Sequence, residues 1–98
     1  MNELNKKLAE WRGFSVENIS HGVYPNFTQS LNACEKWLFP KLYEQGYYYN
    51  LLQWNEGQHK AIINKRTAEW VVTASDAVAE TPALTFCLAV EKIIDGGK

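Results

Sequence analysis

The residues of this 98-residue chain that could do chemistry are aromatic rings and cations, and they are concentrated between positions 47 and 70. Tyrosine and tryptophan rings stack on nucleobases or hold cations over their faces, and lysine and arginine bind phosphate. The first turn of a helix adds an anion site, because its amides have no partner within the helix. This combination predicts a binding site for a phosphorylated, nucleotide-like ligand. The candidate residues of that ligand site are Asn26, Thr28, Tyr48, Trp54, Lys60, Arg66 and Trp70.

The same aromatic residues have two other interpretations. They can be the core of a sheet, with the nearby cations solvated in turns. They can also form a protein interface, where tyrosine, tryptophan and arginine contribute most of the binding energy. Lys60 and Arg66 have the same strand parity, so in each case they are expected to project to one side of a sheet.

Catalytic chemistry has no recognisable local pattern in this sequence. A nucleophile beside a base, paired carboxylates and a glycine-rich phosphate loop are all absent from it. His21 and His59 each stand alone, and the cysteines and histidines lack the spacing of a zinc site. We therefore predict a non-enzymatic protein that uses no metal and no cofactor.

The two cysteines, Cys34 and Cys87, each lie in an apolar helical stripe. A cysteine in such a position is usually a small buried residue, and we expect both thiols to be reduced. A disulfide between them would require that their two helices lie in contact.

Composition predicts a single soluble domain over residues 1–98. The apolar fraction of 46% suffices for a core, and the formal net charge of −1 attracts neither nucleic acid nor an anionic membrane. No apolar run approaches the roughly 20 residues that span a bilayer, and the first residues lack the apolar core of a signal peptide. We therefore expect a cytoplasmic protein with no membrane partner, for which nucleic acid is not the expected partner either.

Helices are predicted at residues 2–11 and 28–46, separated by an ordered loop at residues 14–24. The Thr28 hydroxyl is predicted to be the N-cap of the second helix. Pro40 removes an amide donor from that helix, so a kink or a break is expected next to it. The apolar face of the helix repeats at spacings of three and four, through Leu31, Cys34, Leu38 and Leu42.

Three strands are predicted at residues 47–54, 59–65 and 69–74, because segments rich in aromatic and β-branched residues alternate with short turns. A loop at residues 75–80 is predicted to follow. A last helix then begins at Thr81-Pro82, with threonine as the N-cap and proline at the first helical position. This order predicts an α+β fold, a three-stranded antiparallel sheet with helices packed on it (α-α-β-β-β-α).

Both faces of the predicted sheet are apolar. One face would carry Tyr48, Leu52 and Trp54, and the other would carry Tyr49 and Ile63. A sheet of this kind is usually covered on both faces, by helices or by another subunit. One short N-terminal helix is little cover for the second face, so we expect a homodimer or a larger closed homo-oligomer.

Three segments of the chain occur in an order that resembles a known family. A short helix ending in tryptophan, Leu4–Trp11, precedes the segment PNFTQSLNA at residues 25–33, and the last helix opens with Thr81-Pro82-Ala83-Leu84. These features are similar to those of the phage ABA (α/β/α) sandwich domains, a family of small phage and prophage proteins. The resemblance implies an α/β/α sandwich-like fold, a phage source and the cytoplasm of the host cell, and it implies no established activity.

The function we expect is that of a small phage accessory protein that binds a ligand or a host protein. It would counteract host defence by sequestering a nucleotide-derived signal or by binding a defence protein. The alternative is an RNA-binding or structural phage protein, because the helix, three strands and final helix match the topology of a double-stranded RNA-binding domain. That domain needs a basic start to its last helix, whereas residues 79–83 here contain Glu80 and no lysine or arginine.

Overall fold

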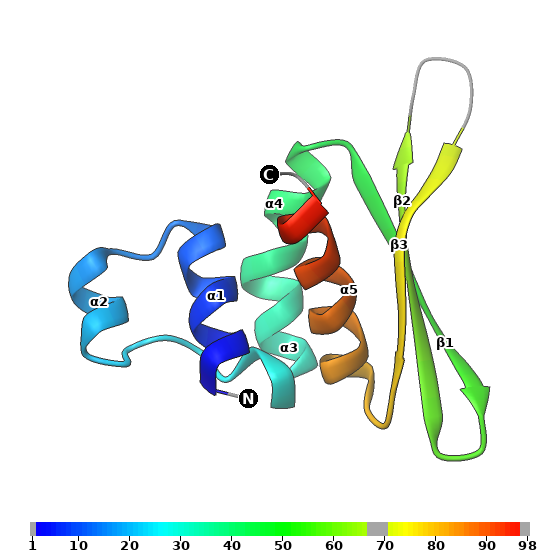
Figure 1. Ribbon diagram of the computed structural model, residues 1–98, viewed down its shortest axis with the longest axis horizontal. Helices are drawn as coiled ribbons and strands as arrows, with labels where there is room; N and C mark the ends of the chain where they lie inside the picture. Colours follow the sequence, from blue (N-terminus) through cyan, green and yellow to red (C-terminus); the bar gives the residue numbers. More distant parts are fainter. Residues whose placement is uncertain (1, 67–70, 97–98) are drawn as a thin grey trace.

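The computed structural model describes residues 2–66 and 71–96 of the chain. Helical segments come first, and three strands and a long last helix follow (Figure 1). The helical elements are α1 (Asn2–Arg12), α2 (Val16–Ser20), η1 (Phe27–Gln29), α3 (Leu31–Ala33), η2 (Cys34–Leu38), α4 (Phe39–Glu44) and α5 (Pro82–Gly96). The strands are β1 (Tyr47–Asn55), β2 (Gln58–Arg66) and β3 (Val71–Ala79).

The three strands form one antiparallel sheet in the order β1-β2-β3, which confirms the predicted α+β class. Two of the predicted strands agree with β1 and β2 to within about a residue. The predicted loop at residues 75–80 is wrong, because β3 continues to Ala79. Its small buried residues Ser75 and Ala77 face α5, and the Ser75 hydroxyl donates a hydrogen bond of 2.9 Å to the carbonyl of Ala89.

One face of the sheet packs on α5. Ala61 and Ile63 of β2 are fully buried there, and the Tyr49 ring of β1 lies with its centroid 4.9 Å from that of Phe86. All helices of the described residues lie on this side of the sheet (Figure 1). The second helical layer that an α/β/α sandwich requires is therefore not present in the described part of the chain.

The central helix is interrupted as Pro40 predicts. The segment η2 is π-helical, and its bond from the Phe39 amide to the Cys34 carbonyl spans five residues. Proline cannot donate the amide that a regular helix needs, and the wider π turn accommodates this gap. Beyond it, α4 continues to Glu44, and Gly46, whose φ is 86°, follows the C-cap residue Gln45 and ends the helix.

Two predictions for the N-terminal half are wrong. The N-cap of α3 is Ser30, whose hydroxyl accepts a hydrogen bond from the Ala33 amide at 3.2 Å, and Thr28 lies instead in the short turn η1. The expected loop at residues 14–24 contains the helix α2, which is capped by the Ser15 hydroxyl at 3.1 Å from the Asn18 amide. Both caps follow the general preference of serine for this position.

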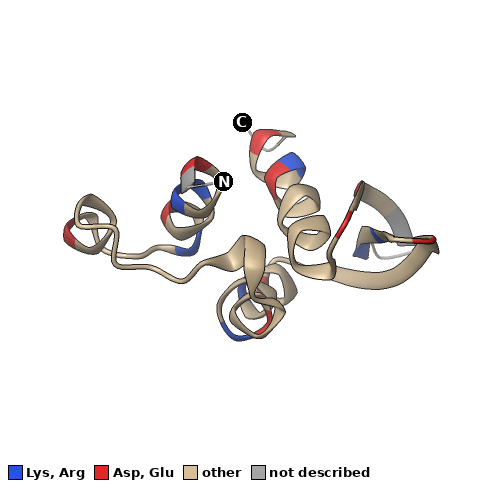
Figure 2. Ribbon diagram, turned by 90° about the horizontal axis from the view of Figure 1, so that it is seen from below, with Lys and Arg blue, Asp and Glu red and all other residues tan. Residues whose placement is uncertain are grey.

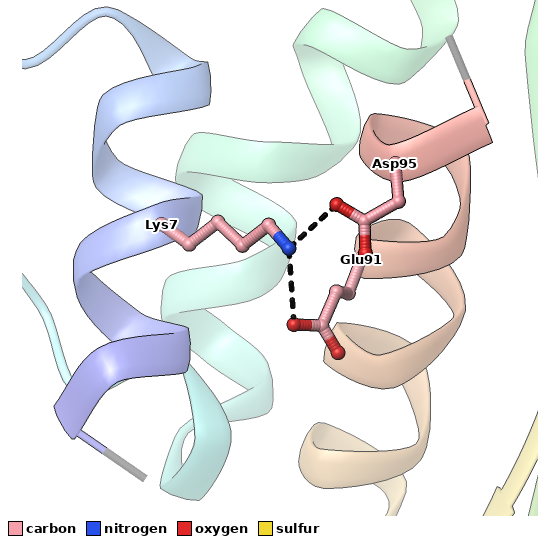
Figure 3. A network of polar contacts seen from close by, with 3 residues as sticks. All are labelled: Lys7, Glu91 and Asp95. Atoms are coloured by element: carbon pink, nitrogen blue, oxygen red, sulfur yellow. Dashed lines mark hydrogen bonds and ion pairs between the residues drawn. The ribbon is translucent and has the colours of Figure 1, made fainter. Parts of the chain in front are cut away.

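The helices α1, α4 and α5 enclose the core together with η1 and η2. The largest fully buried side chains there are Phe27, Phe86, Leu8, Leu38, Leu42, Ile63 and Val90. At the surface, Lys7 of α1 joins α5 through ion pairs of 3.3 Å to Glu91 and 2.6 Å to Asp95 (Figure 3). None of the helices in residues 2–66 and 71–96 has both the length and the apolar character needed to cross a membrane.

Candidate functional site

The side of the sheet that faces away from α5 is its open face. Side chains alternate along a strand, so the residues opposite in parity to Tyr49, Ala61 and Ile63 project to this side. The residues of the open face used below are Tyr48, Leu52, Trp54, Lys60, Arg66, Asp76 and Val78. The open face is the strongest candidate site, because large apolar side chains are exposed on it.

A compact apolar patch lies at the β1–β2 turn end of the open face. Leu52, Lys60 and Val78 are direct cross-strand neighbours in three adjacent strands. Leu52 is 37% exposed, Val78 is 41% exposed and Trp54 is 51% exposed. The Lys60 Nζ lies 4.1 Å from the centroid of the Trp54 ring, a cation–π contact. Trp54 and Lys60 are therefore the two predicted site residues that the fold brings together.

Tyr48 does not join this patch. It lies six residues from Trp54 along β1, a separation of roughly 20 Å in an extended strand. Its ring contacts that of Tyr43 in α4, with centroids 5.5 Å apart in an edge-to-face arrangement, and Tyr43 is 58% exposed. The two tyrosines form a separate aromatic surface where β1 meets α4.

Arg66 does not converge with Lys60 either. The two residues share a parity, as predicted, but they lie six residues apart along β2, again roughly 20 Å. Arg66 is exposed, and its amide donates a hydrogen bond of 3.2 Å to the carbonyl of Gly46. Trp70, the last of the predicted aromatic residues, lies outside the described residues.

Asn26 and Thr28 belong to a partly buried polar network that joins η1 to α1. Asn5 donates to the Asn26 side-chain oxygen at 2.7 Å, and the Thr28 hydroxyl donates to the same oxygen at 3.1 Å. The Thr28 amide in turn donates to the Asn5 side-chain oxygen at 3.0 Å. This segment lies on the other side of α5 from the sheet (Figure 1). Asn26 and Thr28 are therefore distant from Trp54 and Lys60.

The anion site predicted after Thr28 is also wrong. The amide of Thr28 is bonded to Asn5, that of Gln29 to the Asn26 carbonyl at 3.1 Å, and that of Ser30 to the Phe27 carbonyl at 3.3 Å. Amides that are already bonded to the protein do not hold an anion without losing those bonds.

A groove of about 460 Å³ lies between η1 and the start of α5. Its lining includes Thr28, Leu31, Thr81, Pro82 and Leu84, and no charged side chain of the described residues lines it. The Thr81 hydroxyl accepts a hydrogen bond of 3.2 Å from the Leu84 amide, so it caps α5 as predicted. The groove offers apolar surface and neither the aromatic rings nor the cations expected of a nucleotide site.

Metal chemistry has no support in residues 2–66 and 71–96, where no three histidine, cysteine, aspartate or glutamate side chains gather to hold an ion. The two cysteines are buried and unbridged, and their Sγ atoms lie 3.6 Å apart. The helices that carry them are thus in contact, which is the condition stated for a disulfide.

Sequence reasoning missed Val78 as a site residue, because it lay in the predicted loop. Hydropathy gives no signal that could have found it, because residues 75–78 are polar, polar, apolar and apolar. A strand with one buried face is recognised by a period of two, which is absent there.

Comparisons of the chain with family models, with curated proteins and with solved structures found no match. The resemblance to the phage ABA sandwich domains stays a prediction. The function is therefore inferred from the geometry of the open face itself.

Proposed function

We propose that this protein is a non-enzymatic binding protein whose open sheet face binds another protein surface, with a second copy of the chain as its first partner. The observation that carries this proposal is the exposure of Leu52, Trp54 and Val78 side by side. Exposed apolar patches of this kind mark interaction sites, and tryptophan is enriched among the residues that dominate binding energy.

A second copy suits the charge of the open face. Among the described residues, this face carries the cations Lys60 and Arg66 and the anion Asp76, whose carboxylate also lies 4.0 Å from the Nζ of Lys92 in α5. In a twofold interface the same patch is used by both copies, so Lys60 of each copy can approach Asp76 of the other. A face that carries charges of both signs can pair with its own copy.

The size of the open face predicts weak association. Strands of nine residues span about 30 Å and three strands span about 14 Å, so the face offers roughly 400 Å² per copy. Stable complexes bury about 800 Å² per partner. We therefore expect a reversible dimer with a dissociation constant in the micromolar range.

A protein surface fits the open face better than a nucleotide does. A nucleotide site needs a stacking ring and phosphate-binding groups within one ligand length. Lys60 is next to Trp54, but Arg66 is roughly 20 Å further along β2. Because Lys60 alone of these two cations lies beside the Trp54 ring, a nucleotide is the second candidate ligand and not the first.

RNA binding is the less favoured alternative because of how the charges are distributed. The first cation of α5 is Lys92, far from the start of that helix, where Glu80 stands. Figure 2 shows residues of both signs on α1, on α5 and in the sheet, without a basic stripe in the described part. A double-stranded RNA-binding surface would require such a stripe to meet phosphates across a groove.

The biological role we propose follows from the resemblance to the phage family. In the host cytoplasm, the open face would bind a defence protein, or the Trp54–Lys60 pair would bind a nucleotide-derived signal, and either act would counteract host defence. Binding by a small accessory protein would require no catalytic groups.

The experiment that tests the proposal is sedimentation velocity from low to high micromolar concentration. The wild type is expected to change from monomer to dimer over this range. Val78→Ser is expected to raise the dissociation constant of the dimer about tenfold. Val16→Ser is the matched control, because Val16 is 81% exposed on α2, away from the sheet. A wild-type protein that stays monomeric throughout would contradict the dimer, and equal effects of both substitutions would contradict the open face as its location.

Calorimetry with mono-, di- and cyclic nucleotides tests the second candidate. Heat that Trp54→Ala abolishes and Val16→Ser preserves would assign a nucleotide to the open face. Arg66→Ala should leave such heat unchanged, because Arg66 lies too far from Trp54 to share one ligand. Absence of heat with every nucleotide would remove this candidate.

A further inference from the structure

Two thiols from distant parts of the chain meet in the core. Cys34 is the first residue of η2, and Cys87 lies in α5, 53 positions later in the sequence. Their Sγ atoms are 3.6 Å apart, and both residues are 0% exposed. Neither thiol takes part in the open face or in any site described above.

We propose that Cys34 and Cys87 form an oxidation site, at which a small peroxide converts the two thiols into an intramolecular disulfide. A disulfide has an S–S distance of about 2.05 Å, so the sulfur atoms must approach by roughly 1.5 Å. Cys34 lies where the helix changes from α to π. That irregular turn is the part of the helix in which a small displacement disturbs the fewest regular hydrogen bonds.

The chemistry takes place in two balanced steps. In the first, one cysteine sulfur attacks hydrogen peroxide, the O–O bond breaks, and a sulfenic acid and water are formed. In the second, the other sulfur attacks the sulfenic sulfur, the S–O bond breaks, and the disulfide and a second water are formed. The pair loses two electrons and two protons in total, and the peroxide accepts them.

Hydrogen bonds link the two thiols to each other and to the backbone. The Cys34 thiol donates to the Phe27 carbonyl at 3.2 Å, so the hydrogen bond between the two sulfurs is donated by Cys87. That hydrogen bond, together with burial, raises the pKa of Cys87 far above its ordinary value. Both sulfurs are thus hydrogen-bonded thiols in the folded core, and either of them can be the one that attacks the peroxide in the first step.

Burial makes the pair selective for its oxidant. A fully buried sulfur is reached only by a molecule near the size of water or after local opening of the core. Hydrogen peroxide satisfies this condition, whereas a bulky disulfide does not fit beside the two sulfurs. The reaction is therefore expected to be slow compared with that of an exposed thiol.

The disulfide would connect the N-terminal helical half to α5, the helix on which the sheet packs. It would restrict the unfolded chain over the 53 positions between the cysteines, and a restriction of that length raises the melting temperature. The site lies inside the core and not on the open face. Self-association is therefore expected to be the same before and after oxidation, which makes this inference independent of the proposed function.

The test exposes the folded wild type to hydrogen peroxide, unfolds it in an alkylating reagent, and measures its intact mass and melting temperature. The expected product is a monomeric chain that has lost two hydrogens, takes up no alkyl group, melts several degrees higher and returns to the starting state with a thiol reductant. With Cys87→Ala, we expect a sulfenic acid on Cys34, which dimedone traps once the treated protein is unfolded, and no rise in melting temperature.

Three results would overturn the inference. They are two alkylated cysteines after peroxide treatment, a disulfide that joins two chains, and a disulfide that forms only when peroxide is added in denaturant. If Cys87→Ala fails to fold, the wild-type mass and melting temperature still decide between the outcomes.

Discussion

Lys60 and Trp54 lie in contact on the open face of the sheet, with the Lys60 Nζ 4.1 Å from the centroid of the indole ring. The lysine comes from β2 and the tryptophan from β1, so the contact ties the end of one strand to its neighbour. Because Trp54 stays 51% exposed, its ring remains accessible to another molecule. The pair is thus a surface feature and not part of the core.

Trp54→Ala should therefore affect association far more than stability. We expect the free energy of unfolding to fall by less than about 1 kcal/mol, the size of an exposed cation–π contact. Dimer formation should weaken about tenfold or more, since tryptophan is a frequent hot-spot residue. Urea unfolding and sedimentation velocity measure the two quantities. A loss of stability above about 3 kcal/mol would identify Trp54 as a core residue instead.

Leu38→Ala is expected to lower the free energy of unfolding by about 2–5 kcal/mol, because it leaves a cavity in the core. Leu38 is 0% exposed and lies among the largest buried side chains. Leu52→Ala is the matched control, since the same substitution at a residue that is 37% exposed should cost less than about 1.5 kcal/mol. Urea melts compare the two variants, and a shift for Leu38→Ala below about 0.5 kcal/mol would contradict its place in the core.

Ser30→Ala should destabilise the protein by about 0.5–2 kcal/mol through loss of the N-cap of α3. The Ala33 amide, which donates a hydrogen bond of 3.2 Å to the Ser30 hydroxyl, would lose its acceptor. Ser30→Asp is the control, because aspartate is an equally good N-cap and its charge suits the helix start. Thermal melts of the two variants should differ, and equal losses for both would show that the cap is not the cause.

Alkaline pH should weaken the fold through Lys7. The hydrogen bond from Lys7 to Asp95 and the nearby Glu91 carboxylate raise the pKa of Lys7 above its ordinary value of 10.5. The folded protein therefore binds this proton more tightly than the unfolded chain does. The stability contributed by Lys7 is fully present below pH 10.5 and is lost as the pH rises through the higher folded pKa.

Lys7→Met should remove this part of the alkaline loss, and urea melts at a series of pH values between about 9 and 12 measure it. Lys6→Met is the control, because Lys6 is an exposed neighbour on α1. The slope of stability against pH should become shallower for Lys7→Met and stay unchanged for Lys6→Met. Identical slopes in both variants would exclude the ion pairs of Lys7 as the source.

Tyr49 should add a second alkaline contribution of the same sign. Burial raises the pKa of Tyr49 above its ordinary value of 10.0, so the folded protein keeps the phenol proton that the unfolded chain loses. This contribution is present below pH 10.0 and is lost above it. Tyr49→Phe should resist alkali better than the wild type, whereas Tyr43→Phe should not, because Tyr43 is 58% exposed. Alkaline urea melts would contradict this prediction if Tyr49→Phe followed the wild type.

The sequence by itself determined the features that act within one turn of the chain. Thr81 and Pro82 predicted the start of α5, Gly46 predicted the end of the central helix, and Pro40 predicted its interruption. These residues act through their own backbone and nearest amides, so no distant contact is needed to find them. The period of two likewise divided the residues of β1 and β2 between two faces, but both faces are apolar in sequence, so it did not show which face is buried.

The tertiary structure decided the features that depend on residues distant in sequence. Ser75–Ala79 has small residues with little preference for a strand, and it becomes part of β3 because α5 packs closely over Ser75 and Ala77. The separation of Lys60 and Arg66 is a different case, because six residues along one strand already place them roughly 20 Å apart, and that distance excludes a shared ligand. The contact between Cys34 and Cys87 required the packing of two helices, since no local pattern relates residues 53 positions apart.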